Sequence, residues 1–312
     1  MSKLAMVFPG QGSQSVGMMN GYGDLASVKA VIAEASEVLG QDIGALMLAG
    51  PAEDLNRTVN TQPVMVTAGY AAYRAWMELG GAEPEMVAGH SLGEYTALVV
   101  AGVLSFGDCL PLVRLRAQAM QDAVPQGTGA MAAILGLDDD AARAACAEAA
   151  QGEVVEAVNF NAPGQVVIAG HAAAVQRGID ACKARGAKRA VPLPVSAPFH
   201  SSLMAPAAAR LREALAKLAF GTPRIPVVHN VDVKSHGDAQ AIKDALVGQA
   251  NHPVRWVECI GAMAAQGVTH VFECGPGKVL APLSKRISAD LQGLALADRA
   301  GIDQGLQVFR RE

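Results

Sequence analysis

The sequence has 312 residues, of which 51% are hydrophobic and 17% charged, a composition that is typical of a globular chain with a large core and that excludes a disordered one. Its net charge of -4 gives no reason to expect a nucleic acid or an anionic membrane surface as partner. No apolar run approaches the roughly 18 residues that a membrane span needs, and five scattered cysteines without a C-x-x-C pair indicate reduced thiols in a cytoplasmic protein.

The first part of the chain alternates between strand and helix patterns. Residues 4–8 predict a buried strand, and residues 86–89 predict a second one. Helices are predicted over residues 27–39, 63–79, 93–104 and 110–120. This alternation indicates an α/β fold.

A nucleophile-elbow motif lies where the second strand runs into a helix. Gly89-His90-Ser91-Leu92-Gly93 fits the pattern G-x-S-x-G, in which the serine sits in a sharp turn that the flanking glycines allow. The following helix directs its free N-terminal N–H groups toward the serine oxygen. Ser91 is therefore a candidate nucleophile for acyl transfer, and an ordinary strand–helix turn is the alternative in a chain with 33 glycines.

A different order of predicted strands and helices follows a turn-rich segment at residues 125–129. Strands are predicted over 130–136, 154–160, 165–170 and 188–195, and helices over 139–150 and 172–186. The order β-α-β-β-α-β is that of a ferredoxin-like unit. From residue 198 an α/β pattern resumes, with helices over 203–218, 239–250, 254–266 and 279–290 and strands over 226–230 and 268–273. We therefore expect a large α/β catalytic domain (residues 1–126 and 197–312), a small subdomain (residues 127–196) and a ligand cleft between them.

The nucleophile needs a base, and His200 is the best placed of seven histidines. It lies in a loop where the small subdomain rejoins the large domain, and such loops carry catalytic groups disproportionately. His90 neighbours Ser91 but is interpreted as structural, because adjacent residues of an elbow tend to point apart. No motif singles out a carboxylate to orient His200, so a backbone or amide carbonyl is an alternative orienting group.

Two further segments carry candidate chemistry. The loop around Gln11 follows the first strand, and it lacks a dinucleotide fingerprint because Ser15 takes the third glycine position. A backbone N–H in an oxyanion hole and a plain turn both remain open for it. Arg116 lies in an apolar helix, so an inward guanidinium needs an anionic partner, either a substrate carboxylate or a structural salt bridge.

Some patterns are rejected or left open. Gly275-Pro276-Gly277-Lys278 lacks the spacing of a phosphate loop, and no cluster predicts a metal site. Basic residues in the small subdomain and near the C-terminus predict either a solvated surface or a docking patch for an acidic partner: Lys183, Arg185, Lys188, Arg189, Lys285 and Arg286.

Taken together, these segments resemble the malonyl-CoA:acyl carrier protein transacylases of bacterial fatty-acid synthesis over nearly the whole chain. The matching motifs, in the family's order, are Phe8-Pro9-Gly10-Gln11-Gly12-Ser13-Gln14, Gln62-Pro63, Gly89-His90-Ser91-Leu92-Gly93-Glu94, Arg116, Asn159-Phe160-Asn161, Pro198-Phe199-His200 and Glu273-Cys274-Gly275-Pro276-Gly277. The resemblance implies an α/β-hydrolase-like large domain with a ferredoxin-like insert. It also implies malonyl transfer from malonyl-CoA to the phosphopantetheine thiol of holo-acyl carrier protein, without metal or redox cofactor.

The resemblance further assigns roles to single residues. Ser91 is the nucleophile, His200 its base, and the main chain at Gln11 and Leu92 the oxyanion hole. Arg116 pairs with the malonyl carboxylate, and a carbonyl of Gln249 orients the histidine. Residues that match the lining of the acyl or pantetheine channel are Gln62, Met120 and Asn161.

Phe199 departs from some bacterial relatives, which have serine before the histidine. A bulky ring beside the acyl group favours malonyl over methylmalonyl, an effect of about 1–3 kcal/mol. Two other function classes remain: a serine thioesterase or esterase that hands the acyl group to water, and a non-catalytic module that binds a carrier protein.

Overall fold

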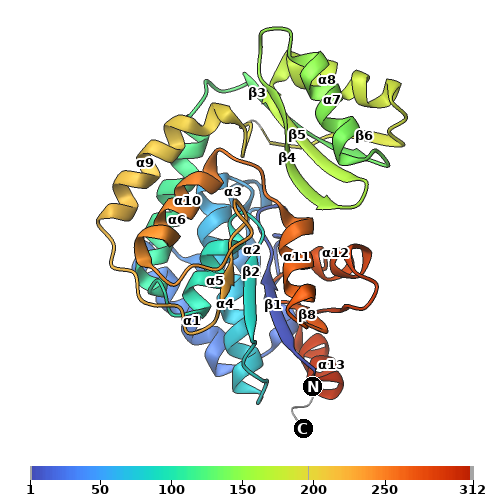
Figure 1. Cartoon of the computed structure of the whole chain (residues 1–312). Helices are drawn as coiled ribbons and strands as arrows, with labels where there is room; N and C mark the ends of the chain where they lie inside the picture. The colour runs from blue at the N-terminus through green and yellow to red at the C-terminus, as the bar shows by residue number, and fades with distance from the viewer. Residues whose placement is uncertain (1, 196, 310–312) are drawn as a thin grey trace.

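The computed structural model describes residues 2–195 and 197–309, which form two sheets flanked by helices (Figure 1). The large sheet is parallel with strand order β7-β2-β1-β8-β9, and the small sheet is antiparallel with order β4-β5-β3-β6. The strands are β1 Leu4–Phe8, β2 Met86–Gly89, β3 Gly129–Leu135, β4 Val155–Ala162, β5 Gln165–His171, β6 Arg189–Pro192, β7 Val227–Val228, β8 His270–Glu273 and β9 Gln292–Ala295. The structure is thus mixed α/β, as the sequence predicts.

The α-helices are α1 Ala26–Leu39, α2 Ile43–Ala49, α3 Ala52–Leu55, α4 Thr58–Glu78, α5 Gly93–Val100, α6 Phe106–Asp122, α7 Asp139–Ala150, α8 Ala172–Ala184, α9 Ala205–Ala216, α10 Ala239–Ala250, α11 Trp256–Ala265, α12 Leu280–Ile287 and α13 Arg299–Val308. Short 3₁₀ turns lie at Asn20–Tyr22 and Ser202–Met204. Within the described ranges no helix combines the length and apolarity that a bilayer crossing requires.

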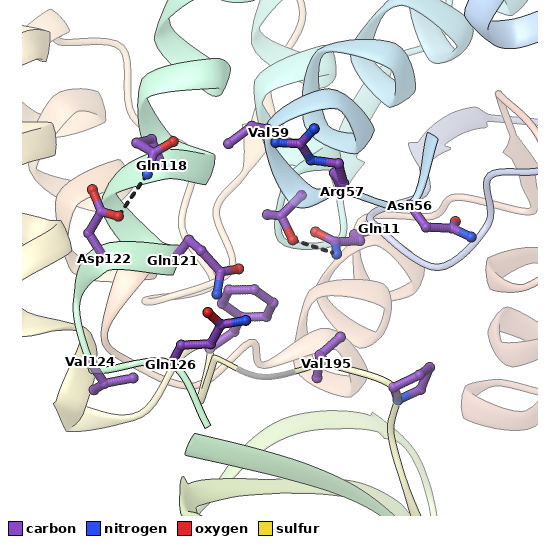
Figure 2. Close-up of a pocket in the computed structure, with 13 residues that line it drawn as sticks. Gln11, Asn56, Arg57, Val59, Gln118, Gln121, Asp122, Val124, Gln126 and Val195 are labelled. Atoms are coloured by element: carbon purple, nitrogen blue, oxygen red, sulfur yellow. Dashed lines mark hydrogen bonds between the residues drawn. The ribbon is translucent and has the colours of Figure 1, made fainter. Parts of the chain in front are cut away.

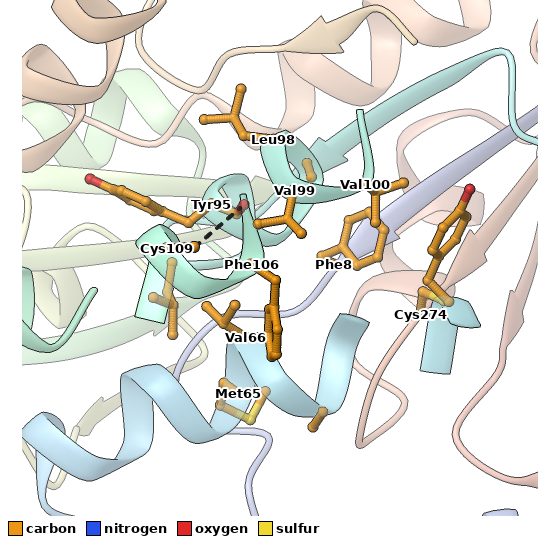
Figure 3. Packing of buried hydrophobic residues seen from close by; sticks show 14 of the residues in the cluster. Phe8, Met65, Val66, Tyr95, Leu98, Val99, Val100, Phe106, Cys109 and Cys274 are labelled. Carbon is orange, nitrogen blue, oxygen red and sulfur yellow. Dashed lines mark hydrogen bonds between the residues drawn. The ribbon is translucent and has the colours of Figure 1, made fainter. Parts of the chain in front are cut away.

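The large sheet is buried on both faces, which explains the nearly continuous apolar sequence of β1. Leu4, Met6 and Phe8 pack into one core with α4, α5 and α6, and Figure 3 shows Phe8 there near residues of these helices. Ala5 and Val7 point to the opposite core, which α11 and α12 cover. The alternation follows from the two-residue period of a strand.

The small sheet has helices α7 and α8 on one face only (Figure 1). Met131 and Val167 point to its other face, where Val195 and Phe199 pack against them. The edge strand β4 is tied to the segment before α11 by hydrogen bonds from Phe160 N to Val254 O (3.0 Å) and from Val254 N to Val158 O (2.8 Å). The face of the small sheet without helices lies toward the elbow, since Met131 on this face lines the same cavity as Ser91.

Several predicted boundaries shift. The helix after the elbow ends at Val100 instead of residue 104, because Gly102 takes a left-handed φ of 76° and turns the chain. The last strand of the small sheet covers Arg189–Pro192 and not residues 188–195, and β7 is reduced to two residues. The sequence interpretation did not predict α2, α3, β9 or α13. Residue 196 of the predicted linker lies outside the described residues.

Candidate active site

The elbow brings Ser91 to the end of β2 in a strained, tightly packed turn. Ser91 has a φ of 51°, in the left-handed region. A Cβ at Gly89 would lie 1.8 Å from the main chain of Gly93, and a Cβ at Gly93 would lie 2.0 Å from the carbonyl oxygen of Phe8. Both glycines are therefore required by close backbone approach, as the motif predicts.

Ser91 and His200 are hydrogen-bonded, although 109 positions separate them in the sequence. The Ser91 Oγ to His200 Nε2 distance is 2.7 Å, and His200 Nδ1 lies 2.8 Å from the main-chain oxygen of Gln249. The orienting group is thus a backbone carbonyl, one of the alternatives left open by the sequence. Nδ1–H donates a hydrogen bond to this carbonyl, which leaves the Nε2 lone pair facing the serine hydroxyl.

His200 is held in its neutral form. The pKa of its imidazole is lowered from 6.5 to about 3, mainly by burial and then by the positive charge of Arg116, and the hydrogen bond to the carbonyl of Gln249 opposes the shift. A neutral imidazole in contact with a hydroxyl can act as a general base.

Arg116 is a buried cation that donates hydrogen bonds to neutral oxygens. Its Nη1 donates to Gln62 Oε1 (2.9 Å), and its Nη2 donates to Ser91 Oγ (3.1 Å) and Gln249 Oε1 (3.1 Å). Its Nε is buried without a hydrogen-bond partner, and no carboxylate lies within 4 Å of the guanidinium in residues 2–195 and 197–309. Burial lowers the pKa of Arg116, and the nearby Tyr95 and Glu94 oppose this shift. The structural salt bridge considered from the sequence is therefore not formed within this part of the chain.

A small cavity of about 120 Å³ lies over Ser91. It is lined by Gln11, Gln62, His90, Ser91, Leu92, Arg116, Met120, Met131, Asn159, Leu193, Val195, Phe199 and His200. A larger cavity of about 580 Å³ shares Gln11, Val195 and Phe199 with it and continues between Arg57 and the end of α6 (Figure 2). Amide side chains line much of this larger cavity: Gln11, Asn56, Gln118, Gln121 and Gln126. The reactive serine is thus reached from a polar vestibule.

Two main-chain N–H groups border the cavity. Leu92 precedes α5, and Gln11 follows β1 and holds its side chain against Thr58 through an Nε2–Oγ1 hydrogen bond of 3.2 Å. In the described part of the chain neither N–H has a backbone or side-chain acceptor. Both residues lie beside Ser91 in the cavity lining, so they are available to an oxygen that develops charge there.

Most predicted site residues come together, with two differences. Gln62, Met120 and Phe199 line the cavity over Ser91, but Asn161 does not: its Oδ1 accepts from His90 Nε2 at 2.7 Å, and Asn159 takes the place in the lining. His90 has the structural contact that the sequence interpretation expected, but it also lines the cavity. Burial lowers its pKa. The strand β4 thus touches the elbow through one hydrogen bond.

Sequence reasoning missed the amide and carboxylate behind the elbow. Asn230 accepts from Ser91 N (2.8 Å) through Oδ1 and donates to Gly89 O (2.8 Å) through Nδ2. Its main-chain N–H donates to Glu94 Oε2 (3.0 Å). The signal was the acidic residue at the start of an otherwise apolar helix, because a buried Glu94 must find donors.

In the segment that resembles a phosphate loop, a carboxylate of the same chain occupies the main-chain N–H groups. The carboxylate of Glu273 accepts from the N–H groups of Val279 (3.0 Å), Leu280 (2.8 Å) and Ala281 (2.9 Å) at the start of α12. These are the orphan donors that would otherwise hold a phosphate. The rejection of a P-loop is consistent with this. In the described ranges no cluster of three potential ligands forms a metal site.

The basic residues near the C-terminus and in the small sheet meet at one junction. Arg286 on α12 donates to Gln165 Oε1 (2.7 Å) and Pro163 O (3.1 Å) in the turn between β4 and β5. Leu135 pairs with both Gln165 and Arg189, so Arg189 lies in the same cross-strand row. Lys188, Arg189, Lys285 and Arg286 are exposed and have no acidic partner within 4 Å in the described ranges. We call these four residues the basic junction.

The sequence and the structure match known acyltransferases over nearly the whole chain. Residues 5–292 match the family described as the acyl transferase domain. The malonyl CoA-acyl carrier protein transacylase of Escherichia coli (strain K12) is 55% identical over 312 residues, 99% of this chain and 100% of the relative. The crystal structure of acyl-carrier-protein S-malonyltransferase from Burkholderia pseudomallei 1710b is 63% identical, with a TM-score of 0.96 over 98% of this chain and 99% of that one. A malonyl-transacylase in complex with a type II PKS acyl-carrier protein is 52% identical, with a TM-score of 0.97 over 99% and 100%.

Proposed function

Because the chain belongs to the acyl transferase domain family, as a malonyl-CoA:acyl carrier protein transacylase, we propose that it moves malonyl by a ping-pong route through malonyl-Ser91. The observation that carries this mechanism is the hydrogen bond between Ser91 and a neutral His200 beside Arg116, a buried cation without a carboxylate partner in the described ranges. An acyl group that carries its own carboxylate supplies that partner.

The first half-reaction acylates the enzyme. His200 Nε2 takes the proton of Ser91 Oγ as that oxygen attacks the thioester carbon of malonyl-CoA. The N–H groups of Gln11 and Leu92 stabilise the oxyanion. The carbon–sulfur bond then breaks, and protonated His200 returns the proton to the leaving thiol, so CoA departs and malonyl remains as an ester on Ser91.

The second half-reaction reverses these steps with a different thiol. The phosphopantetheine thiol of acyl carrier protein gives its proton to His200 and attacks the ester carbon. Ser91 Oγ leaves and takes the proton back. Thioester–ester exchange is redox-neutral and its protons balance within this pair of residues, so we infer that no metal or redox cofactor is required.

The cavities are consistent with these substrates. The phosphopantetheine arm carries two amide groups and is shared by both thiols, and the amide-lined vestibule of Figure 2 offers matching donors and acceptors. Gln62 and Met120 border the acyl group, and Asn161 supports the wall by holding His90. Phe199 lies beside Ser91 and His200, where an extra methyl on the malonyl α-carbon would meet its ring. We therefore assign Phe199 a preference for malonyl over methylmalonyl.

The carrier protein docks at the basic junction in this proposal. Arg286 contacts the β4–β5 turn, and Arg189 lies in the cross-strand row that ends at Gln165 beside this turn. Lys285 and Lys188 adjoin these two residues in the sequence, and the root of the turn contacts His90 through Asn161. An acidic carrier surface placed there would be attracted electrostatically and would present its arm near the elbow.

The fold assignment of the proposal is finer than mixed α/β. We assign residues 1–126 and 197–312 to an α/β-hydrolase-like catalytic domain and residues 127–196 to a ferredoxin-like subdomain, which the strand order β4-β5-β3-β6 and the helices on one face support. The five free, buried cysteines favour a reducing compartment, and we propose the cytoplasm.

One experiment separates transfer from hydrolysis and from binding alone. The protein is mixed with malonyl-CoA, holo-acyl carrier protein is then added, and each species is followed by intact mass. Transfer predicts a malonyl adduct on Ser91 that disappears as malonyl-carrier appears. Rapid malonate release without carrier would support a thioesterase, and absence of any adduct would leave a non-catalytic module.

A further inference from the structure

A buried carboxylate lies directly behind the nucleophile elbow. Glu94 is fully buried, and its Oε1 lies 2.6 Å from His229 Nδ1, whereas its Oε2 accepts from Asn230 N (3.0 Å) and Gln249 Nε2 (2.9 Å). In residues 2–195 and 197–309 no lysine or arginine lies within 4 Å of it. Glu94 therefore acts as a hydrogen-bond acceptor inside the site and not as one half of an ion pair with Arg116.

Gln249 connects this carboxylate with the reacting groups. Its Nε2 donates to Glu94 Oε2 (2.9 Å) and to Ser91 O (2.9 Å), and its Oε1 accepts from Arg116 Nη2 (3.1 Å). Its main-chain oxygen accepts from His200 Nδ1. One residue thus contacts the nucleophile, the base and the carboxylate-binding cation.

The orientation of this amide has only one satisfactory solution. A carboxylate and a main-chain carbonyl are acceptors, so the amide NH₂ must face Glu94 and Ser91 O. The amide oxygen must then face Arg116. A flipped amide would set its NH₂ against the guanidinium and its oxygen against the two acceptors, which breaks these hydrogen bonds of the side chain.

We propose that Glu94 is a positioning residue that fixes the amide of Gln249 and, through it, the guanidinium of Arg116, and that it thereby determines the preference for acyl groups bearing a carboxylate. This inference rests on the proposed function and names a determinant of its selectivity. Main-chain support of the elbow, from Asn230 and from Gln249 Nε2 to Ser91 O, serves every acyl group, whereas the contact of Gln249 Oε1 with Arg116 serves acyl groups with a negative end.

A matched pair of variants tests the hydrogen bond separately from volume. Glu94→Met keeps the length of the side chain but removes both oxygens, so the amide of Gln249 loses its anchor. Glu94→Gln keeps an oxygen toward Asn230 and Gln249, because the new NH₂ can face His229 Nδ1, whose ring can shift its proton to Nε2. His229 Nε2 has no partner among the described residues, so no hydrogen bond opposes that tautomer.

The measurement is kcat/KM for malonyl-CoA and for acetyl-CoA, with holo-acyl carrier protein as acceptor. We expect Glu94→Met to lower the malonyl-to-acetyl ratio about tenfold or more, the loss of one hydrogen bond to a charged group, and Glu94→Gln to keep it within about threefold. The rate at which a serine-reactive fluorophosphonate labels Ser91 reports on the elbow and His200 without any acyl carboxylate. Its loss in Glu94→Met should be smaller than the loss of malonyl transfer.

The double variant Glu94→Met/Gln249→Met completes a double-mutant cycle with the two single variants. If Glu94 acts through Gln249, the double variant has the malonyl-to-acetyl ratio of Gln249→Met alone. Equal losses for malonyl and acetyl, or selectivity losses that add, would overturn the proposal. If Glu94→Met does not fold, Glu94→Asp withdraws the acceptor from Gln249 by about one bond length and should lower the ratio; an unchanged ratio there would also overturn it. Wild-type protein that transfers no malonyl would instead refute the proposed function.

Discussion

The buried, neutral His200 makes the stability of the folded chain fall as the solution becomes acidic. Its folded pKa of about 3 lies below the ordinary value of 6.5, so between these values the unfolded state binds a proton that the folded state does not. Stability from this source is complete above the unfolded pKa and is lost as pH falls below it. Each pKa unit corresponds to about 1.36 kcal/mol, so lowering the pH from 7 to 5 costs about 2 kcal/mol of unfolding free energy.

The variant His200→Asn isolates this contribution. Asparagine does not titrate, and it tolerates the left-handed φ of 65° at this position better than most residues. Urea unfolding of both proteins at pH 7, 6 and 5 gives the unfolding free energies, and groups common to both cancel in the difference. We expect the wild type to lose about 2 kcal/mol more than the variant between pH 7 and 5. Equal losses would refute a neutral, buried His200 and with it the argument for its role as a general base.

Three other changes test separate parts of the site. Arg116→Ala should lower kcat/KM for malonyl-CoA at least about tenfold more than for acetyl-CoA, because only malonyl offers a carboxylate to the guanidinium; equal losses would exclude that contact. Gly93→Ala, whose Cβ would lie 2.0 Å from a main-chain oxygen, should destabilise the fold by about 3 kcal/mol or more in urea unfolding, whereas Gly261→Ala, with no atom within 4 Å, should be neutral or stabilising by up to about 1 kcal/mol. Lys285→Glu should raise KM for acyl carrier protein several-fold in steady-state assays at low salt and leave KM for malonyl-CoA unchanged. The same change at the exposed Lys217, which follows α9, should alter neither KM, and a matching rise in both variants would argue against the basic junction.

Local patterns predicted the parts of the site that depend on local geometry. The elbow was recognisable because a strand, two glycines and a helix follow one another within a few residues, and the structure confirms each of them. The small sheet was predictable for the same reason, since its strands and helices alternate with clear periods. The pairing of Ser91 with His200 rested on the loop position and on the family resemblance, because 109 intervening residues carry no periodic signal.

The network behind the elbow had no such signal. Glu94, Asn230 and Gln249 come from α5, from the segment after β7 and from α10, and only the folded chain brings them together. The family motif predicts Asn161 in the lining, but the register of β4 shifts between Phe160 and Ala162, so Asn159 lines the cavity and Asn161 contacts His90 instead. The strand β9 was missed because Gln292–Ala295 contains no β-branched residue, and α13 because two glycines interrupt its pattern.

The carboxylate of Glu273 has a consequence for how the chain distinguishes between anions. Because this side chain belongs to the same polypeptide, it acts as an intramolecular ligand whose effective concentration at the start of α12 is of the order of millimolar or more. Free phosphates, including those of CoA, must compete with a ligand that cannot dissociate from the chain. The glycine-rich loop therefore does not offer its N–H groups to an anionic ligand. A negatively charged group is instead expected to bind beside Ser91, where the hydrogen-bond partners of Arg116 in the described part of the chain are uncharged oxygens.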